Sequence, residues 1–370
     1  MKVLVLPCST GGGHNSAAKA VKEAFENSGD ECELIDMHSL INKKRTKQAA
    51  RIYSFIVLRL SWLFGAAYSV ASLISHPGGH SPIYIFNIKY AKVIYKYIVE
   101  NNIDAVVCTH LFPAEAMTRV KRKYAPDFPF FFVATDYTCS PFNEETTPDL
   151  FFIPHAELTS EYRGVDEDKK VPTGIPCAAK FRNIDKNSAR ESAGVTGTDG
   201  HILFMGGSMG FGNMWNTLRK IKKALPGDYT YTVLGGHNSA LKKGFYKLSG
   251  QKNVNFVDFT EHAEIYIGSA DVIFTKPGGL TTTEAAVAGI PIVHTKPIPG
   301  CETKNASFFS THGMSVIYKK NKDVKKVIDI IEKEEVRQDM LKRQKENINA
   351  SAADDICRTI TENIKNRKGA

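Results

Sequence analysis

Three glycine-rich segments follow short apolar runs, and each lies close to a side chain that can do chemistry. The first, Thr10-Gly11-Gly12-Gly13-His14, comes directly after Lys2–Leu6. Glycines let a backbone approach a ligand closely, and a helix that begins there offers free N–H groups to an anion. His14 would sit at the mouth of such a site and could act as a general base. The alternative is an incidental surface histidine, and the spacing differs from the G-x-G-x-x-G of dinucleotide sites.

The second segment, Met205-Gly206-Gly207-Ser208-Met209-Gly210, follows the apolar run Ile202–Met205. Ser208 and the loop amides, including that of Gly207, could hold a pyrophosphate. The segment lacks the Lys-Ser/Thr pair of a P-loop, which disfavours ATP hydrolysis. A plain connecting turn is the other interpretation.

The third segment, Lys276-Pro277-Gly278-Gly279-Leu280-Thr281-Thr282-Thr283-Glu284, follows a buried apolar run. Thr281 or Thr282 is expected to cap a helix whose amides can take a phosphate. A carboxylate near bound phosphate is repelled by it, so Glu284 needs another partner, and ribose hydroxyls would be one. The alternative is a capping-box glutamate that only satisfies the helix end.

A proline-rich loop, Pro297-Ile298-Pro299-Gly300-Cys301, leads into Glu302 and Asn305. Acidic and amide side chains commonly hold sugars, because they hydrogen-bond neighbouring hydroxyls. Glu302 and Asn305 are therefore candidates for sugar recognition. A polar surface loop is the alternative.

Apolar runs alternate with helical patterns along most of the chain. Many of the runs are apolar throughout, which is typical of parallel strands covered on both faces. The expected strands are Lys2–Leu6, Glu33–Met37, Asp104–Thr109, Phe130–Thr135, Leu150–Ile153, Val171–Thr173, Ile202–Met205, Thr230–Leu234, Val254–Val257, Val272–Phe274 and Ile290–His294. The expected helices include Asn15–Ser28, Pro82–Asn101 with Ser81 as N-cap, Pro113–Tyr124 and Thr282–Ala288. The alternation predicts an α/β fold of doubly wound, Rossmann-like domains.

The length of 370 residues is enough for two domains. A polar stretch before a fresh strand at His201 predicts domains at 1–175 and 201–370, joined by a linker at 176–200. Ligands of two such domains would bind in a cleft that both face, at the carboxyl ends of the strands. The last helices, from about Val324 to Ile364, could pack back on the first domain.

Positive charge gathers in one part of the chain. The net charge is +9, and residues 37–123 hold 13 Lys or Arg against three acidic residues. The same stretch contains the most apolar segment, Ile52–Ser75, and basic charge beside apolar bulk suits anionic lipid better than nucleic acid. Arg59 within it disfavours a membrane span. An interfacial helix is expected, with an interior helix as the alternative; its membrane contacts would be Lys43, Lys44, Arg45, Lys47, Arg51, Trp62 and Phe64.

The seven cysteines are scattered, with no C-x-x-C pair and no zinc spacing. Such a set indicates reduced thiols and a cytoplasmic protein, here expected at the cytoplasmic face of the membrane. No metal site is predicted. The sequence also lacks a zinc finger or RNP-like motif, so nucleic-acid binding is not expected.

Taken in order, the motifs resemble those of the monogalactosyldiacylglycerol synthase and processive diacylglycerol glucosyltransferase family. The resemblance runs from about Lys2 to Ile317. Besides the segments above it includes Cys108-Thr109-His110-Leu111-Phe112-Pro113-Ala114 and Ala134-Thr135-Asp136-Tyr137. It implies a GT-B fold, two Rossmann-like domains facing a cleft, and inversion at the anomeric carbon without an essential metal or cofactor.

The resemblance also implies roles for residues. His14 would be the general base and Asp136 would orient it or the acceptor, with Gly12, Gly13 and His110 on the acceptor side. The acceptor would be diacylglycerol. The donor would be UDP-glucose or UDP-galactose. Glu284 would bind its ribose, Phe256 and Val257 its uracil, and Glu302 and Asn305 its hexose. The contacts of the diphosphate would be Gly207, Ser208, Lys276, Gly278, Gly279 and Thr281.

This chain departs from the family pattern in two places. Cys301 stands where members commonly carry glutamine, which removes one hydrogen-bonding amide from the sugar loop. Residues 138–142 replace a histidine and an aromatic on the acceptor side. Alternative functions are a transferase of N-acetylglucosamine to a lipid-linked peptidoglycan precursor, a soluble UDP-N-acetylglucosamine epimerase, which would not need Ile52–Ser75, and a non-catalytic UDP-sugar or lipid-binding regulator.

Overall fold

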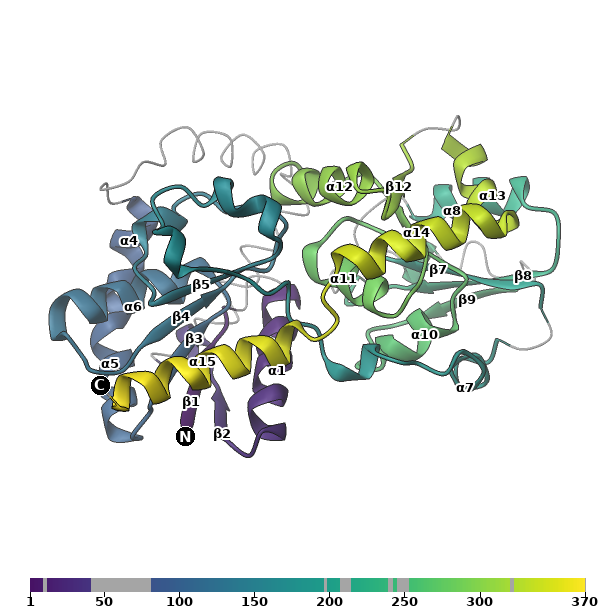
Figure 1. The fold of residues 1–370 in the computed structure, drawn as a ribbon. Helices are drawn as coiled ribbons and strands as arrows, with labels where there is room; N and C mark the ends of the chain where they lie inside the picture. The colour runs from purple at the N-terminus through teal and green to yellow at the C-terminus, as the bar shows by residue number, and fades with distance from the viewer. Residues whose placement is uncertain are drawn as a thin grey trace. The chain divides into compact units, whose positions relative to one another are not determined.

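The computed structural model divides the chain into two compact units, each built on its own sheet (Figure 1). The first unit holds Met1–Ala178, Pro299–Cys301 and Asn349–Ala370, and the second holds Ala179–Ile298 and Glu302–Ile348. The structure describes residues 1–8, 12–40, 81–195, 198–206, 214–238, 242–244, 253–319 and 323–369. The expected interfacial helix Ile52–Ser75, its basic neighbours, Gly207 and Ser208 lie outside these ranges.

The first unit is a six-stranded sheet in the order β2-β1-β3-β4-β5-β6, with every pairing parallel. Its strands are β1 Lys2–Leu6, β2 Glu31–Leu34, β3 Ala105–Cys108, β4 Phe130–Val133, β5 Leu150–Ile153 and β6 Lys170–Pro172. All residues of β3 and β4 are buried. Both faces of these central strands are therefore covered, as their uninterrupted apolar runs predict.

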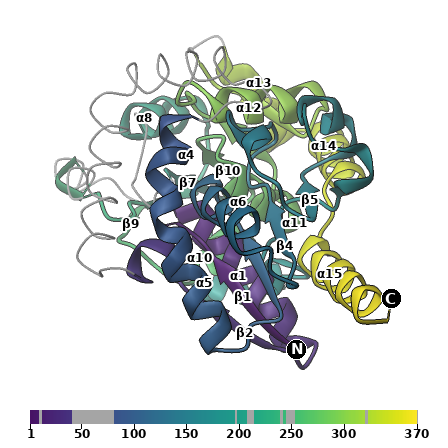
Figure 2. The same cartoon turned by 90° about the vertical axis from the view of Figure 1, so that its left-hand side faces the viewer.

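Helix α1 (Gly12–Asn27) and the last helix, α15 (Ala352–Gly369), cover one face of this sheet together. Phe25 of α1 and Ile360 of α15 share one buried cluster with the strands, and the two helices lie against each other (Figures 1 and 2). The carboxyl-terminal helix thus belongs to the first unit. Helices α4 (Pro82–Asn87), α5 (Ala91–Glu100) and α6 (Leu111–Tyr124) pack beside one another (Figure 2).

The second unit is also a parallel six-stranded sheet, in the order β12-β11-β10-β7-β8-β9. Its strands are β7 Gly200–Met205, β8 Tyr229–Leu234, β9 Val254–Val257, β10 Val272–Thr275, β11 Ile292–His294 and β12 Ser315–Ile317. Its helices are α7 Lys186–Ser192, α8 Met214–Ala224, α10 Ala263–Ser269, α11 Gly279–Val287, α12 Cys301–Thr311, α13 Val324–Glu332 and α14 Glu334–Asn347. Residues of α8, α13 and α14 close one core with the strands.

The predicted α/β class of two doubly wound domains is confirmed, with small differences in its elements. Strand β12 was not among the predicted strands. The predicted strand Glu33–Met37 is misplaced: β2 is Glu31–Leu34, and Asp36 accepts a hydrogen bond from the backbone N–H of His38 at 2.9 Å. That bond turns the chain into a 3-10 helix, which buries Met37.

The predicted helix start is confirmed at α4, where Ser81 is the N-cap. Its hydroxyl accepts from the N–H of Tyr84 at 3.1 Å, and proline occupies the first turn. The stretch predicted as one helix, Pro82–Asn101, consists of α4, the 3-10 turn Ile88–Tyr90 and α5. Within the expected linker, the 3-10 turn η6 (Ala179–Phe181) and α7 lie in the second unit.

Candidate active-site elements in the two units

The first unit brings three strand ends to one edge of its sheet. Strands β1, β3 and β4 are neighbours in parallel register, with Leu6 beside Cys108 and Cys108 beside Phe132. The segments that follow these strands carry His14, His110 and Asp136, so topology alone gathers them at the edge where α/β folds bind ligands.

His14 is held in one orientation by residues far along the chain. Its Nδ1 lies 3.0 Å from the carbonyl oxygen of Thr109 and 2.8 Å from Oγ1 of Thr135. The Thr109 hydroxyl in turn donates to the His14 carbonyl at 3.1 Å. Because a carbonyl oxygen only accepts, Nδ1 carries the proton and the neutral ring has its lone pair on Nε2.

The electrostatics favour this neutral form. Burial lowers the pKa of His14, and the charge of Asp136 and the hydrogen bond to Thr109 only partly oppose that effect. A neutral imidazole with a free Nε2 lone pair is the form that can take a proton from a hydroxyl.

His110 stands beside His14 with the opposite tautomer. It is the N-cap of α6, and its Nδ1 accepts from the N–H of Phe112 at 3.1 Å, which leaves the proton on Nε2. The two imidazole centroids are 4.5 Å apart with their planes at 86°. Burial lowers the pKa of His110 well below its ordinary value, so it too is uncharged at neutral pH. Gly12 and Gly13 form the first residues of α1.

The second unit presents the start of α11 at the carboxyl end of β10. Strand β10 ends at Thr275, and Gly278 is the N-cap of α11 without a side-chain hydrogen bond. A Cβ at Gly278 would meet nothing within 4 Å. The first N–H groups of α11, those of Gly279 to Thr281, are therefore not capped by the N-cap residue and can face an anion.

The expectation that Thr281 or Thr282 caps this helix is wrong, because the helix begins earlier. Thr282 is fully buried inside α11, and its hydroxyl lies 3.3 Å from Nε2 of His294. The N-cap residue is Gly278, which has no side chain and therefore cannot accept a hydrogen bond from the first N–H groups of the helix.

Glu284 is the sixth residue of α11. The glutamate of a capping box is the third residue of its helix, so Glu284 lies too far along the helix for that role. That alternative interpretation is excluded. The residue is 8% exposed, and within the described part of the chain its carboxyl group makes no hydrogen bond or ion pair. Burial raises the pKa of Glu284 to about 8. Smaller effects come from the charge of Lys180, which lowers this pKa, and from that of Glu264, which raises it.

The predicted sugar loop is connected to the Lys276 segment. Lys276 forms an ion pair with Glu302, whose other carboxylate oxygen accepts from the N–H of Ile298 at 2.8 Å. Asn305 is fully buried, and its amide donates to the carbonyl of Pro277 at 3.0 Å. In this structure Asn305 supports the loop that carries Lys276, and Glu302 holds the lysine by an ion pair.

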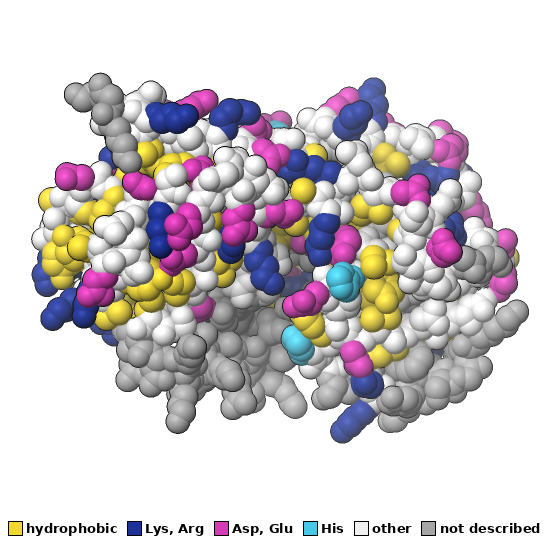
Figure 3. All heavy atoms as spheres, turned by 90° about the horizontal axis from the view of Figure 1, so that it is seen from below, with side chains coloured by type: hydrophobic (Ala, Val, Ile, Leu, Met, Phe, Trp, Pro, Cys, Tyr) yellow, Lys and Arg dark blue, Asp and Glu magenta, His cyan; other side chains and the backbone are white. Residues whose placement is uncertain are grey.

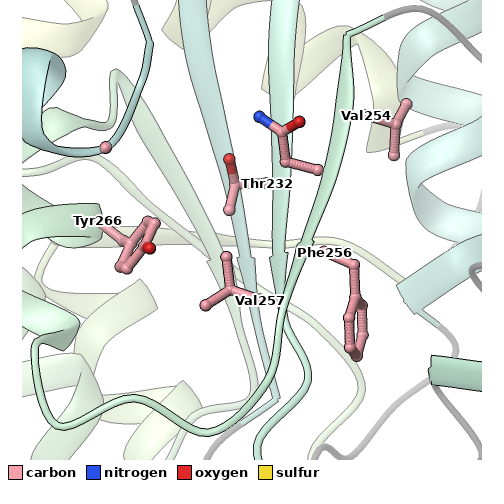
Figure 4. Close-up of a pocket in the computed structure, with 7 residues that line it drawn as sticks. Thr232, Val254, Phe256, Val257 and Tyr266 are labelled. Carbon is pink, nitrogen blue, oxygen red and sulfur yellow. The ribbon is translucent and has the colours of Figure 1, made fainter.

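Phe256 and Val257 lie on opposite sides of the edge strand β9 (Figure 4). The Phe256 ring packs over Gly235, where a Cβ would come within 2.2 Å of it. The Val257 carbonyl accepts from the N–H of Gly235 at 2.8 Å, which fixes the loop after β8. A pocket of about 470 Å³ lies along this strand, lined by Ala193, Thr232, Val254, Asn255, Phe256, Val257 and Tyr266.

Sequence reasoning missed the roles of Thr109, Thr135 and Lys180. Thr109 directly follows β3 and Thr135 comes two residues after β4; these are the two strands next to β1 on that side of the sheet. Polar residues just after adjacent parallel strands were the available signal for them. Lys180 had no such signal, because its contacts with α10 depend on tertiary packing.

Two family models divide the chain between them. The monogalactosyldiacylglycerol (MGDG) synthase model matches residues 14–177, and the model of the glycosyltransferase family 28 C-terminal domain matches residues 201–360. The chain belongs to the MGDG synthase and processive diacylglycerol glucosyltransferase family. The GT-B prediction is thereby confirmed together with the family.

Individual relatives agree over nearly the whole length. A processive diacylglycerol beta-glucosyltransferase of Bacillus pumilus is 24% identical, with 98% of this chain and 94% of the relative covered. The chloroplastic monogalactosyldiacylglycerol synthase of Spinacia oleracea is 26% identical over 88% of this chain and 65% of its own. Among solved structures, Acinetobacter baumannii MurG has a TM-score of 0.64 at 15% identity, covering 98% of this chain and 99% of its own, which shows a shared fold.

Proposed function

We propose that this glycosyltransferase moves a hexose from UDP-glucose or UDP-galactose to the free hydroxyl of diacylglycerol, with inversion at the anomeric carbon. The observation that carries the donor assignment is in the second unit. There Gly278 leaves the start of α11 without a side-chain cap, and the buried Glu284 is the sixth residue of the same helix. Helix-end N–H groups suit a diphosphate, and a buried carboxyl without protein partners suits ribose hydroxyls. The names of the curated relatives support diacylglycerol as acceptor.

In the proposed reaction, Nε2 of His14 takes the proton of the acceptor hydroxyl. The acceptor oxygen forms a bond to C1 of the hexose while the bond from C1 to the UDP oxygen breaks on the opposite side. Lys276 and the first N–H groups of α11 would stabilise the charge that develops on the departing diphosphate, without an essential metal. Gly207, Ser208, Phe256 and Val257 remain the proposed diphosphate and uracil contacts, and Glu302 the hexose contact.

Because diacylglycerol is a membrane lipid, the enzyme would act at a membrane surface. We propose that it attaches peripherally to the cytoplasmic face of the membrane. All seven cysteines are free, which fits a reducing compartment. Among the described residues no helix is long and apolar enough to cross a membrane. Ile85 and Phe86 of α4 are 61% and 55% exposed, and the ammonium of Lys89 stands 3.2 Å over the Phe86 ring. Hydrophobic side chains lie among Lys and Arg at the left-hand end of Figure 3, the end that carries α4 and α5 in Figure 1.

The direct test is incubation with diacylglycerol-containing liposomes and each UDP-hexose in turn, followed by mass analysis of the lipids. A hexosyl-diacylglycerol product from one donor supports the proposal and identifies the sugar. Product formed only with a lipid-linked peptidoglycan precursor, or with no lipid at all, would replace it.

Attachment is tested separately by sedimentation with liposomes. Replacement of Lys43, Lys44, Arg45 and Lys47 by Ser should reduce binding to anionic liposomes at low salt, since each basic group near such a surface contributes about 1 kcal/mol. UDP affinity should not change. Equal binding to neutral and anionic liposomes at all salt concentrations would contradict an electrostatic attachment.

A further inference from the structure

The turn that packs against the helix of Glu284 carries a cation, and that cation pairs with a carboxylate on a third element of the second unit. The 3-10 turn η6 carries Lys180, and α10 carries Glu264. Turn η6 contacts both α10 and α11. All three groups belong to the same compact unit.

Lys180 is held in place by two acceptors on the segment that begins α10. Its Nζ is 2.7 Å from Oε2 of Glu264 and 2.8 Å from the carbonyl oxygen of Glu261. The other oxygen of Glu264 lies 3.3 Å from Nδ1 of His262. The ammonium therefore has a defined position, although the lysine side chain is 45% exposed.

The two neighbours act on Glu284 with opposite sign. Burial has the largest effect on the pKa of Glu284 and raises it. The positive charge of Lys180 lowers this pKa, and the negative charge of Glu264 raises it. Burial alone would raise the pKa of Glu264 as well, but its hydrogen bond from Lys180 and further contacts leave that pKa lowered. Glu264 is thus the ionised member of the pair of carboxyl groups.

The buried residues of the other elements that pack on α11 carry no charge at neutral pH. Helix α14 packs on α11, and its buried residues are Met340 and Gln344, neither of which titrates. His294 of β11 contacts Thr282, and burial lowers the pKa of that histidine to about 3, so it is neutral. After burial, Lys180 and Glu264 are therefore the charged groups that act on the pKa of Glu284.

We propose that Lys180 and Glu264 are positioning residues that tune nucleotide binding in opposite directions, Lys180 by favouring the carboxylate form of Glu284 and Glu264 by opposing it. A carboxylate accepts hydrogen bonds on both oxygens, whereas a protonated carboxyl group has one oxygen that donates. Two ribose hydroxyls that donate together require the carboxylate. Binding of the nucleotide then releases the Glu284 proton to the buffer. This inference rests on the proposed function, which assigns the ribose to Glu284.

The test is calorimetric titration with UDP at pH 7 and pH 9, in pairs of buffers with different ionisation enthalpies. If the loss of the cation lowers the ionised fraction of Glu284 about tenfold, Lys180→Met weakens UDP binding about tenfold at pH 7. Glu264→Gln should strengthen binding about fivefold at the same pH by the same reasoning. At pH 9 both differences should shrink to about twofold or less, because at least about half of Glu284 is then ionised in every protein.

Two control variants separate charge from packing. Lys180→Arg keeps the cation and should retain most of the wild-type affinity. Lys186→Met removes another partly exposed lysine of the same unit, one that pairs with Asp271 at 2.6 Å, and should leave UDP binding unchanged. Wild-type protein should release a proton on binding at pH 7, and Glu284→Gln should abolish that release.

The outcomes distinguish this inference from the function beneath it. Weakening by both Lys180→Met and Glu264→Gln, to the same extent at pH 7 and pH 9, would show a structural role and overturn the inference alone. Wild-type affinity in both variants, with Glu284→Ala still weakened, would also overturn it alone. Failure of the wild-type protein to bind UDP would overturn the proposed function as well.

Discussion

The edge around His14 and the helix around Glu284 occupy equivalent places, at the carboxyl ends of parallel strands, yet they treat their reactive side chain differently. In the first unit Nδ1 of His14 contacts Thr109 and Thr135, and one tautomer results. In the second unit the Glu284 carboxyl makes no hydrogen bond within the described residues. A proton acceptor has to be oriented before the reaction begins, whereas a group that binds hydroxyls must keep its lone pairs for the ligand.

The first unit contains an informative counterpart to Glu284. Glu115 of α6 is fully buried, and burial likewise raises its pKa to about 8. One of its oxygens accepts from the amide of Asn87 at 2.6 Å, so the carboxyl is tied into the packing of α4 on α6. The same shift in pKa therefore accompanies a structural carboxyl in one unit and a candidate ligand-binding carboxyl in the other.

The largest effect is expected from removal of the base. His14→Ala should lower turnover by about 10²–10⁴-fold, the usual contribution of a positioned proton acceptor, and leave UDP affinity nearly unchanged. Steady-state rates on diacylglycerol liposomes and calorimetry with UDP measure the two quantities. Near-normal turnover would transfer the role to another group, with Asp136 the first to test.

The next effect concerns the donor side and should reverse that pattern. Glu284→Ala should weaken UDP binding by about 1.5–3 kcal/mol, as expected for hydrogen bonds to a charged group. Circular dichroism should show an intact fold. The control variant Asp271→Asn, at the other end of β10, should not reproduce the loss of UDP affinity. Unchanged UDP affinity in Glu284→Ala would remove the ribose assignment and with it the contrast between the two units.

Glu115 should show its effect in stability and not in binding. Its folded-state pKa is raised above the unfolded value, so the folded chain binds more protons between about pH 4.5 and pH 8. Stability from this group is then lost as the pH rises through that window. Glu115→Gln should remove this part of the slope, at most about 5 kcal/mol, in urea unfolding at pH 5 and pH 8.5. UDP affinity should stay at the wild-type value, and a parallel loss would mean that the two carboxyls are coupled.

The smallest effect is expected from metal removal. If helix-end N–H groups and Lys276 stabilise the departing diphosphate, EDTA should leave wild-type turnover within about twofold. The measurement is the liposome assay with and without chelator. Loss of activity that added divalent cation restores would show that the start of α11 is not sufficient.

Much of this protein follows from local sequence alone. Apolar runs predicted eleven strands, of which Glu33–Met37 was misplaced; several runs are apolar throughout, because a strand buried on both faces has no polar side. Ser81 predicted the start of α4, since its hydroxyl satisfies a backbone N–H three residues away. Glycine turns after strands predicted where ligands would bind, and their order along the chain predicted the family.

Other features were decided only by tertiary structure. The tautomer of His14 depends on Thr109 and Thr135, which lie 95 and 121 residues away, and on the sheet order that brings their strands beside β1. The start of α11 fell at Gly278 and not at Thr281 or Thr282, because burial against His294 took Thr282 into the helix interior. Lys180 reaches Glu264 from 84 residues earlier in the chain. Such contacts leave no local pattern: they depend on which elements pack together, and a pattern of residue types along the chain encodes only each element's own conformation and buried face.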